Sequence, residues 1–259
     1  MSIYQHFRAY EHPFVDRVLS WKQQVERTYT PYVTDFLDPR ERHIVRSLIG
    51  ENNEEIVYSF YGVHDEAERK RAVIAPFYET INEESFVLQL LESKYERKFN
   101  ELSHRDVLGA LMSLGIDRKK IGDIYVGEDR LQIIVDDTIA SFIKLELNRI
   151  RRASVRFEEV PFSEVIGSMD EWQENVKTVA SLRLDVVIKE IYNISRNKAA
   201  QFITSKKVKV NHLQIDDPAL QLAEKDLISV QGKGRSKLLA IEGETRKGRL
   251  RVTTARLKT

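Results

Sequence analysis

The spacing of apolar residues between positions 86 and 160 constrains the fold of this chain more than any other feature of the sequence. Runs with the two-residue repeat of strands alternate there with runs that have the helical repeat. They follow in the order strand 86–91, helix 103–114, strands 123–126 and 131–135, helix 137–150 and strand 154–160. This β-α-β-β-α-β order predicts a ferredoxin-like sandwich, an architecture that RNA-recognition domains share.

Local signals support these boundaries. Ser103 is a good N-cap with Asp106 three residues later, and Gly115 is well placed to end the first helix. The strands carry few aromatic residues and no RNP-type signature, so core packing is favoured over base stacking. The aromatic residues concerned are Phe86, Tyr125 and Phe157.

The segment before this domain predicts a smaller α+β unit. Apolar residues have helical spacing at 14–27, and Asp38 with Pro39 marks the start of a second helix that Gly50 ends. Two strand-like runs follow, at 56–61 and 71–78. We therefore expect a multi-domain α+β protein. Its expected parts are an N-terminal domain at 1–80, the ferredoxin-like domain at 81–162, a linker at 163–180 with a short helix around Trp172, and a C-terminal domain at 181–259.

The charges of the chain are segregated. The whole sequence is nearly balanced, with 41 Lys and Arg against 40 Asp and Glu and a net charge of +1. Residues 181–259 nevertheless carry a net charge of +9, and residues 1–180 carry −8. A basic C-terminal third on an acidic body indicates a localised contact with a polyanion.

The basic third begins with two helix signals. Leu184, Val187, Ile188 and Ile191 have helical spacing, and Ser195 is suited to cap a second helix that runs to about residue 205. Arg196 and Lys198 lie in the first turn of that second helix. Asp185 is expected to pair with a nearby basic residue or to cap a turn. Cations in a first turn oppose the helix dipole, whereas an anionic ligand at the N-terminus would explain them.

Strand-like and loop-like basic segments follow. Lys and Val alternate from Lys206 to Val210, and a second strand is predicted at 226–230. Residues 231–237 are expected to form a flexible basic loop, after which basic residues continue to the end of the sequence.

This pattern resembles the S4 RNA-binding domain. The matching blocks are Arg183-Leu184-Asp185, Ser195-Arg196 with Lys198-Ala199, Lys207 to Asn211, Asp226 to Val230 and Gly232 to Arg235. His212 and Asn193 stand near positions where the family commonly has Gly. The resemblance implies two helices and a following loop that dock against helical RNA, mainly through phosphate contacts. The implied contact residues are Arg183, Ser195, Arg196, Lys198, Lys206, Lys207, Lys209, Asn211, Lys233 and Arg235.

The arrangement of the whole chain looks like the YlmH family of bacterial S4-domain proteins. The residues that carry this likeness are Phe36 to Glu41, Ala67 to Ala72, Ser103 to Ile116 and Gly122-Asp123-Ile124. The resemblance implies binding to rRNA or tRNA on the large ribosomal subunit, in translation quality control. A genomic link of the family to cell division is a weaker hint.

Motifs for chemistry are missing from the sequence. There is no Cys, none of the six His lies in a His-Glu-x-x-His pair, and no P-loop or Gly-x-Ser-x-Gly occurs. We therefore expect no catalytic residue, metal or cofactor. Two alternatives stay open, namely an RNA-modifying enzyme with its site in residues 1–160, and a protein-interaction scaffold linked to cell division.

The sequence also carries an expectation about location. The first residues lack the apolar segment of a signal peptide, and no run reaches the ~18 apolar residues of a membrane helix. We expect a cytoplasmic, monomeric protein without a membrane contact.

Overall fold

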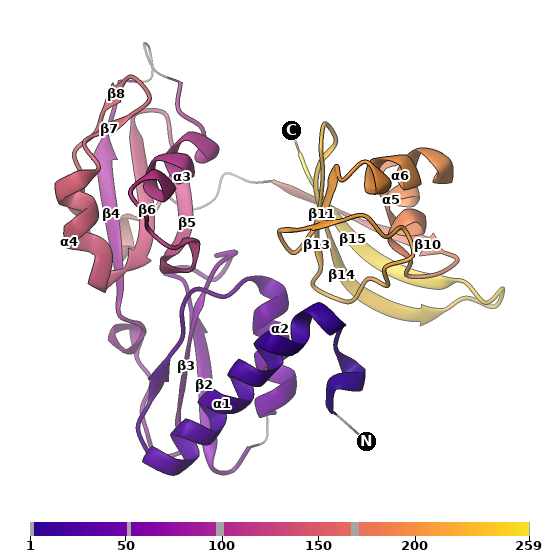
Figure 1. Ribbon diagram of the computed structural model, residues 1–259, viewed down its shortest axis with the longest axis horizontal. Coiled ribbons are helices and arrows are strands. Elements are labelled where there is room, and N and C mark those ends of the chain that lie inside the picture. The colour runs from indigo at the N-terminus through magenta and orange to yellow at the C-terminus, as the bar shows by residue number, and fades with distance from the viewer. Residues whose placement is uncertain (1–2, 51–52, 97–100, 167–170, 259) are drawn as a thin grey trace. The chain divides into compact units, whose positions relative to one another are not determined.

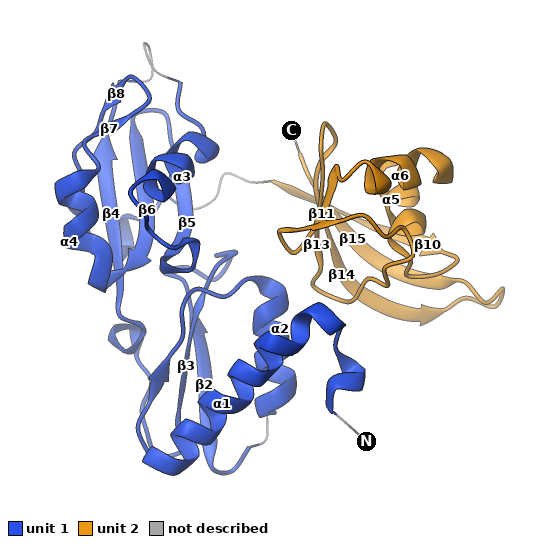
Figure 2. Ribbon diagram, in the orientation of Figure 1, with its two compact units in different colours: residues 1–169 blue, residues 170–259 orange. Residues whose placement is uncertain are grey.

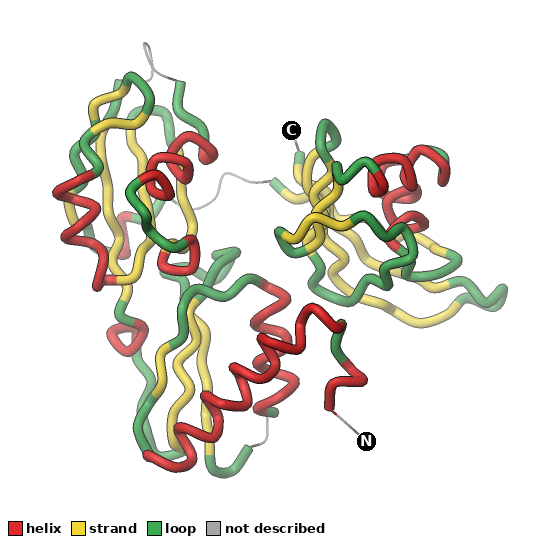
Figure 3. Tube along the Cα trace, viewed as in Figure 1, coloured by secondary structure: helices red, strands yellow, loops and turns green. Residues whose placement is uncertain are grey.

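Helices and strands alternate through most of the chain, so the expected α+β class is confirmed (Figure 3). The computed structural model describes residues 3–50, 53–96, 101–166 and 171–258. They fall into two units, Met1–Met169 and Asp170–Thr259 (Figure 2). The finer boundary between residues 80 and 81 stays a prediction. No helix in the described ranges is long and apolar enough to cross a membrane.

The first part of unit 1 packs two helices on a three-stranded antiparallel sheet (Figure 1). Asp38 begins the second helix as predicted, because its side chain accepts a hydrogen bond from the backbone N–H of Glu41 at 2.8 Å. The sheet order is β1-β3-β2, which leaves β2 at an edge. The elements are α1 (His12–Thr28), β1 (Tyr32–Val33), α2 (Pro39–Ile49), β2 (Ile56–Tyr61) and β3 (Arg71–Pro76).

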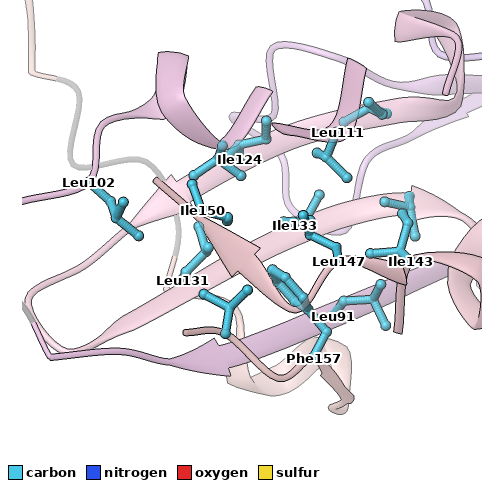
Figure 4. Close-up of a cluster of buried hydrophobic side chains, with 14 of the residues drawn as sticks. Leu91, Leu102, Leu111, Ile124, Leu131, Ile133, Ile143, Leu147, Ile150 and Phe157 are labelled. Carbon is cyan, nitrogen blue, oxygen red and sulfur yellow. The ribbon is translucent and has the colours of Figure 1, made fainter. Parts of the chain in front are cut away.

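The second part of unit 1 is a four-stranded antiparallel sheet of order β5-β6-β4-β9 with two helices. Leu111 of α3, Ile143 of α4, and Leu91 and Ile133 of the sheet share one buried cluster (Figure 4). The elements are β4 (Leu88–Lys94), α3 (His104–Ser113), β5 (Ile121–Val126), β6 (Arg130–Asp136), α4 (Asp137–Glu146), β7 (Arg149–Ile150), β8 (Ala153–Ser154) and β9 (Glu158–Glu159). Short 3-10 helices lie at Ile3–His6, Ala9–Glu11, Glu83–Phe86, Arg118–Lys120 and Phe162–Glu164.

Three expected elements of this part are wrong in extent. The strand expected at 86–91 is β4 (Leu88–Lys94), and Phe86 belongs to the 3-10 helix before it. The helix expected at 137–150 ends at Glu146, and the strand expected at 154–160 is broken into β8 and the two-residue β9. A tight β7–β8 hairpin takes over residues 149–154, with Arg151 in the left-handed region at φ 54°. The hairpin buries Ile150 and Ala153 in the core, which explains the apolar residue that extended the helical pattern.

A buried ion-pair network joins the two parts of unit 1. Arg71 of β3 donates from Nε to the carbonyl of Thr34 at 2.6 Å and from Nη1 to that of Val87 at 2.9 Å. Its Nη1 also lies 3.4 Å from Oδ2 of Asp136, which accepts a hydrogen bond from Nζ of Lys120 at 2.8 Å. Because Asp136 caps α4 through the N–H of Thr138, one carboxylate holds the helix start and the junction together.

Unit 2 is a six-stranded antiparallel sheet with two helices against one face (Figure 1). The helices α5 and α6 begin where the sequence predicts. Val208, Val210 and Leu238 point from the sheet into the core that the helices cover. The elements are β10 (Trp172–Val179), α5 (Leu184–Tyr192), α6 (Arg196–Thr204), β11 (Val208–Val210), β12 (Leu213–Ile215), β13 (Leu227–Val230), β14 (Gly234–Glu244) and β15 (Leu250–Leu257), and the sheet order is β10-β15-β14-β13-β11-β12.

Two expectations for the borders of this unit are wrong. The short linker helix around Trp172 is instead the strand β10, which pairs with β15 from Trp172↔Leu257 to Val179↔Leu250. The flexible loop expected at 231–237 becomes strand β14 from Gly234 onward, and the basic C-terminal residues form β15. β10 forms because its backbone groups pair with a strand that is distant in sequence, which local patterns do not reveal, whereas β14 pairs with its neighbours in sequence, β13 and β15.

The replacement Arg71→Met tests the junction. It removes the donor to two buried carbonyls and one of the two cations beside Asp136, so we expect the free energy of unfolding to fall by about 3–5 kcal/mol, measured by urea denaturation. Arg130→Met is the matched control, because the Arg130 side chain is 44% exposed and lies 3.7 Å from Glu92. Its loss is expected to stay below about 1 kcal/mol. Equal losses in the two variants would contradict a structural role for the junction.

The same junction predicts a pH dependence. Burial acts to raise the pKa of Asp136, but hydrogen bonds from Lys120 and Thr138 and the charge of Arg71 outweigh it and lower the pKa. The stabilisation is therefore complete above the unfolded pKa of about 3.9 and is lost as the pH falls through the lower folded-state pKa. Asp136→Asn is expected to destabilise most near neutral pH, with the difference from wild type shrinking below about pH 4. A difference independent of pH in urea titrations would refute this role.

Candidate nucleic-acid interface

A buried carboxylate fixes two arginines at the surface of unit 2. Asp185 of α5 is 3% exposed and accepts hydrogen bonds from Nε and Nη2 of Arg183 at 3.1 and 3.2 Å. It also accepts one from Nε of Arg196 at 2.9 Å, at the start of α6. The expected pairing of Asp185 with a nearby basic residue is confirmed. The carboxylate ties together Arg183 and Arg196, which lie thirteen positions apart on either side of α5.

The charge of Asp185 is secured by its partners. Burial alone acts to raise its pKa, but the hydrogen bonds and charges of Arg183 and Arg196 lower it below the usual range. The pKa of Arg183 is raised by the same hydrogen bond. The Arg196 side chain remains 56% exposed and that of Arg183 34% exposed. Both guanidinium groups are therefore held in fixed orientations while still open to an external anion.

The first turn of α6 adds a third cation. Ser195 caps this helix, because its hydroxyl accepts a hydrogen bond from the backbone N–H of Lys198 at 3.2 Å. The Lys198 side chain is exposed, and the first turn contains no acidic residue. Arg183, Arg196 and Lys198 are called the helix group below. Ser195 serves this group by fixing the start of the helix.

A second set of cations lies on the sheet face that the helices leave open. Lys209 of β11 stands opposite Ser229 of β13, which stands opposite Arg235 of β14, so these side chains share one face. Lys207 and Lys237 lie two positions from Lys209 and Arg235 and therefore belong to the same face. Lys207, Lys209, Arg235 and Lys237 are called the sheet group below.

The remaining candidates differ in their surroundings. Lys206 is exposed and lies 3.9 Å from Asp216, with a backbone φ of 58°. Lys233 sits in the turn before β14, where its N–H donates to the carbonyl of Val230 at 2.9 Å. Both residues precede their strands at the same end of the sheet, because β11 and β14 each run antiparallel to β13.

Asn211 has a structural role that the sequence did not predict. Its Nδ2 donates to Asp226 at 2.7 Å, and its Oδ1 accepts from the N–H of Leu227 at 2.9 Å. The backbone of Asn211 and His212 is left-handed, with φ of 49° and 67°. This explains why Gly is common at the position of His212 in the family, since Gly adopts such angles without steric cost.

Sequence reasoning missed one aromatic residue of this face. Trp172 of β10 lies under two cations, with Nζ of Lys237 4.1 Å and Cζ of Arg235 5.6 Å from its ring centroid. The only signal in the sequence was a run of β-branched residues after it, Val176, Thr178 and Val179. Trp172 orders the cations of the sheet group by stacking beneath them.

Most of the predicted contact residues therefore belong to the helix group or the sheet group, and the structure adds Lys237 to the sheet group. Lys206 and Lys233 lie beside the sheet group, and Ser195 and Asn211 are supports. Among the described residues, no group of three or more His, Asp or Glu side chains is arranged to hold a metal ion. Lys198, Lys207 and Lys209 form no ion pair with any residue in the described ranges. Exposed cations without carboxylate partners are available to an external polyanion.

Comparisons with known proteins identify the segments of this chain. Family models match three segments: the N-terminal domain of YlmH at residues 10–79, a model described as an RNA-binding domain in YlmH at 82–164, and the S4 domain at 182–228. The "Ribosome-associated protein quality control protein P2" of Bacillus subtilis (strain 168) is 40% identical over 257 residues, which cover 99% of each chain.

A solved structure is also similar. It is the "Cell division protein ylmH from Streptococcus pneumoniae", with 34% identity and a TM-score of 0.55, and the match covers 64% of this chain and 100% of that one. The resemblance inferred from the sequence is thus confirmed along the whole chain. With an N-terminal YlmH domain, an RNA-binding middle domain and a C-terminal S4 domain, this chain belongs to the YlmH family.

Proposed function

We propose that this protein is a ribosome-associated factor of protein quality control that docks on helical rRNA or tRNA of the large subunit without catalysing a reaction. The observation that carries the proposal is the set of exposed ammonium groups of Lys198, Lys207 and Lys209, which have no ion-pair partner among the described residues. They lie in and around a domain that matches the S4 model. The name of the Bacillus subtilis relative supports the ribosomal setting.

The two groups of cations suit phosphate more than base edges. Ammonium groups on flexible stems bind phosphates as point charges, and they release condensed counterions when they do so. The guanidinium groups of the helix group are held by Asp185 and can bind a phosphate with two parallel donors. Recognition by shape and charge follows from this set, as is usual for double-stranded RNA.

We further propose that the middle domain is a ferredoxin-like sandwich. The antiparallel strand order β9-β4-β6-β5, with α3 and α4 in the two crossovers, supports this topology. The aromatic residues Phe86, Tyr125 and Phe157 do not serve as a base-stacking platform, because they are only 3%, 6% and 3% exposed. RNA contacts of this domain would therefore use other side chains.

Replacing Lys198, Lys207 and Lys209 together with Ala tests the docking proposal. We expect weaker co-sedimentation with large ribosomal subunits, and a salt dependence of log K that is less steep by about one unit per lost phosphate contact. The matched control removes three cations of unit 1, Lys22, Arg27 and Lys119, and is expected to bind as wild type does. Unchanged co-sedimentation of the first variant at moderate salt would contradict the proposal.

Asp185→Asn separates positioning from net charge. The variant is one charge more positive, so an effect of charge alone predicts tighter binding to RNA. Loss of the hydrogen bonds that fix Arg183 and Arg196 predicts weaker binding, by about tenfold. We expect the second result in a titration of labelled ribosomal subunits, with circular dichroism as a control for folding. Tighter binding would show that the orientation of the two arginines is unimportant.

A further inference from the structure

An open polar pocket lies in the N-terminal part of unit 1, away from the S4 domain in the sequence. Its volume is about 570 Å³, within the usual range of ligand pockets. One wall is formed by α2 together with Gly50 and Asn53, and the other is the edge strand β2. The lining residues are Arg42, Arg46, Gly50, Asn53, Ile56, Val57, Tyr58, Ser59, Phe60 and Lys70.

Three cations line this pocket, and none of them has a carboxylate partner among the described residues. Arg42 donates from Nη2 to the carbonyl of Glu68 at 3.1 Å, and Lys70 donates from Nζ to the carbonyl of Asp65 at 2.7 Å. Neither of these two side chains, nor Arg46, forms an ion pair with a residue in the described part of the chain. The buried Nε of Arg42 also has no hydrogen-bond acceptor there.

The cations are close enough to repel one another. Burial is the first cause that lowers the pKa of Lys70, and the charge of Arg42 is the second. The pKa of Arg42 is lowered by burial and then by the charge of Arg46. Nearby carboxylates act in the opposite direction without removing these shifts. A bound anion would relieve the repulsion, so the pocket is poised for a negative ligand.

The aromatic residues of β2, on the other wall of the pocket, indicate that the bound anion is a nucleotide phosphate. Cζ of Arg46 lies 5.3 Å from the ring centroid of Phe60, and the Phe60 ring packs edge-on against Tyr58 at 5.5 Å. A guanidinium stacked on an aromatic ring presents its N–H edge to phosphate and its plane to a base. Combined stacking surfaces and cations are typical of sites that bind single-stranded RNA.

We propose that this pocket binds a phosphate group of a single-stranded RNA segment, which gives the N-terminal domain an RNA contact of its own. The proposal rests on the function proposed above only in taking RNA as the partner. It differs in the surface used, because the pocket lies in unit 1 and the S4 contacts lie in unit 2. Arg46 and Lys70 would neutralise the phosphate, and Arg42 would be held behind them by Glu68.

The test uses the full-length chain and an eight-nucleotide uridine-rich RNA, roughly the length that such grooves accommodate. All pocket and control substitutions are made in a protein that already carries Lys198→Ala, Lys207→Ala and Lys209→Ala. The S4 surface then contributes little to the measured RNA binding. We expect Arg46→Gln with Lys70→Gln to weaken the remaining binding by about tenfold in fluorescence anisotropy. Lys22→Gln with Arg27→Gln removes the same charge from the same domain and is expected to leave it unchanged.

Ultraviolet crosslinking of wild-type protein to the same RNA provides the second readout. Crosslinked peptides are expected to include Tyr58 or Phe60 and to disappear in the Arg46→Gln, Lys70→Gln variant. Equal effects of the pocket and control variants, or no crosslink to β2, would overturn the proposal. So would equally tight binding of uridine monophosphate or of a glutamate-rich peptide in place of the RNA. If the pocket variant keeps full binding while the S4 variant loses ribosome co-sedimentation, the pocket proposal fails and the docking proposal stands.

Discussion

The ion pair between Arg71 and Asp136 is the interaction on which the architecture of unit 1 depends. Arg71 belongs to the central strand of the first sheet, whereas Asp136 ends a central strand of the second and caps α4. Both side chains are almost fully buried, so neither charge is well solvated by water. Arg71 finds its carboxylate partner in the other part of the unit, and Asp136 is paired with both Arg71 and Lys120. Close packing reinforces this junction, because a Cβ on Gly122 would lie 2.6 Å from the ring of buried Phe36. Residue 122 must therefore remain without a side chain.

Cations have two distinct roles in the described parts of this chain. Arg40 and Arg71 are buried and paired with Glu11 and Asp136, so these cations have a structural role. Lys198, Lys207 and Lys209 of the S4 region and the three cations of the pocket between α2 and β2, called the β2 pocket here, have no ion-pair partner among the described residues, although acidic residues are nearly as numerous as basic ones in the sequence. A chain with this many carboxylates could pair those cations internally. Their isolation marks the surfaces where the counter-charge comes from another molecule.

The sequence predicts those features that depend on neighbours in the chain. Asp38, Ser103 and Ser195 cap their helices as expected, because a cap needs only the next three residues. The strand at Trp172 could not be predicted, because its partner β15 lies at the other end of unit 2. The roles of individual candidates in RNA binding remain predictions. Asn211 illustrates the reason, since an amide suited to RNA is turned inward to Asp226, a contact that only the fold creates. The β2 pocket could not be predicted from the sequence, because Lys70 lies far along the chain from α2.

The strands outside the S4 match add basic residues and an aromatic ring to the sheet face that is proposed to contact RNA. The match to the S4 domain ends at residue 228, yet the sheet continues through β14 and β15. The edge strand next to β15 is β10, whose residues precede the match in the sequence. Arg235, Lys237 and Trp172 all come from these added strands. The strands outside the match therefore supply two of the four cations of the sheet group, Arg235 and Lys237, and the Trp172 ring against which these two pack. Because Lys209 reaches Arg235 only through Ser229 of β13, the short strands of the S4 core connect the added strands to β11. The basic face is thus a property of the whole six-stranded sheet, and a contact surface defined from the S4 segment alone would omit its aromatic support.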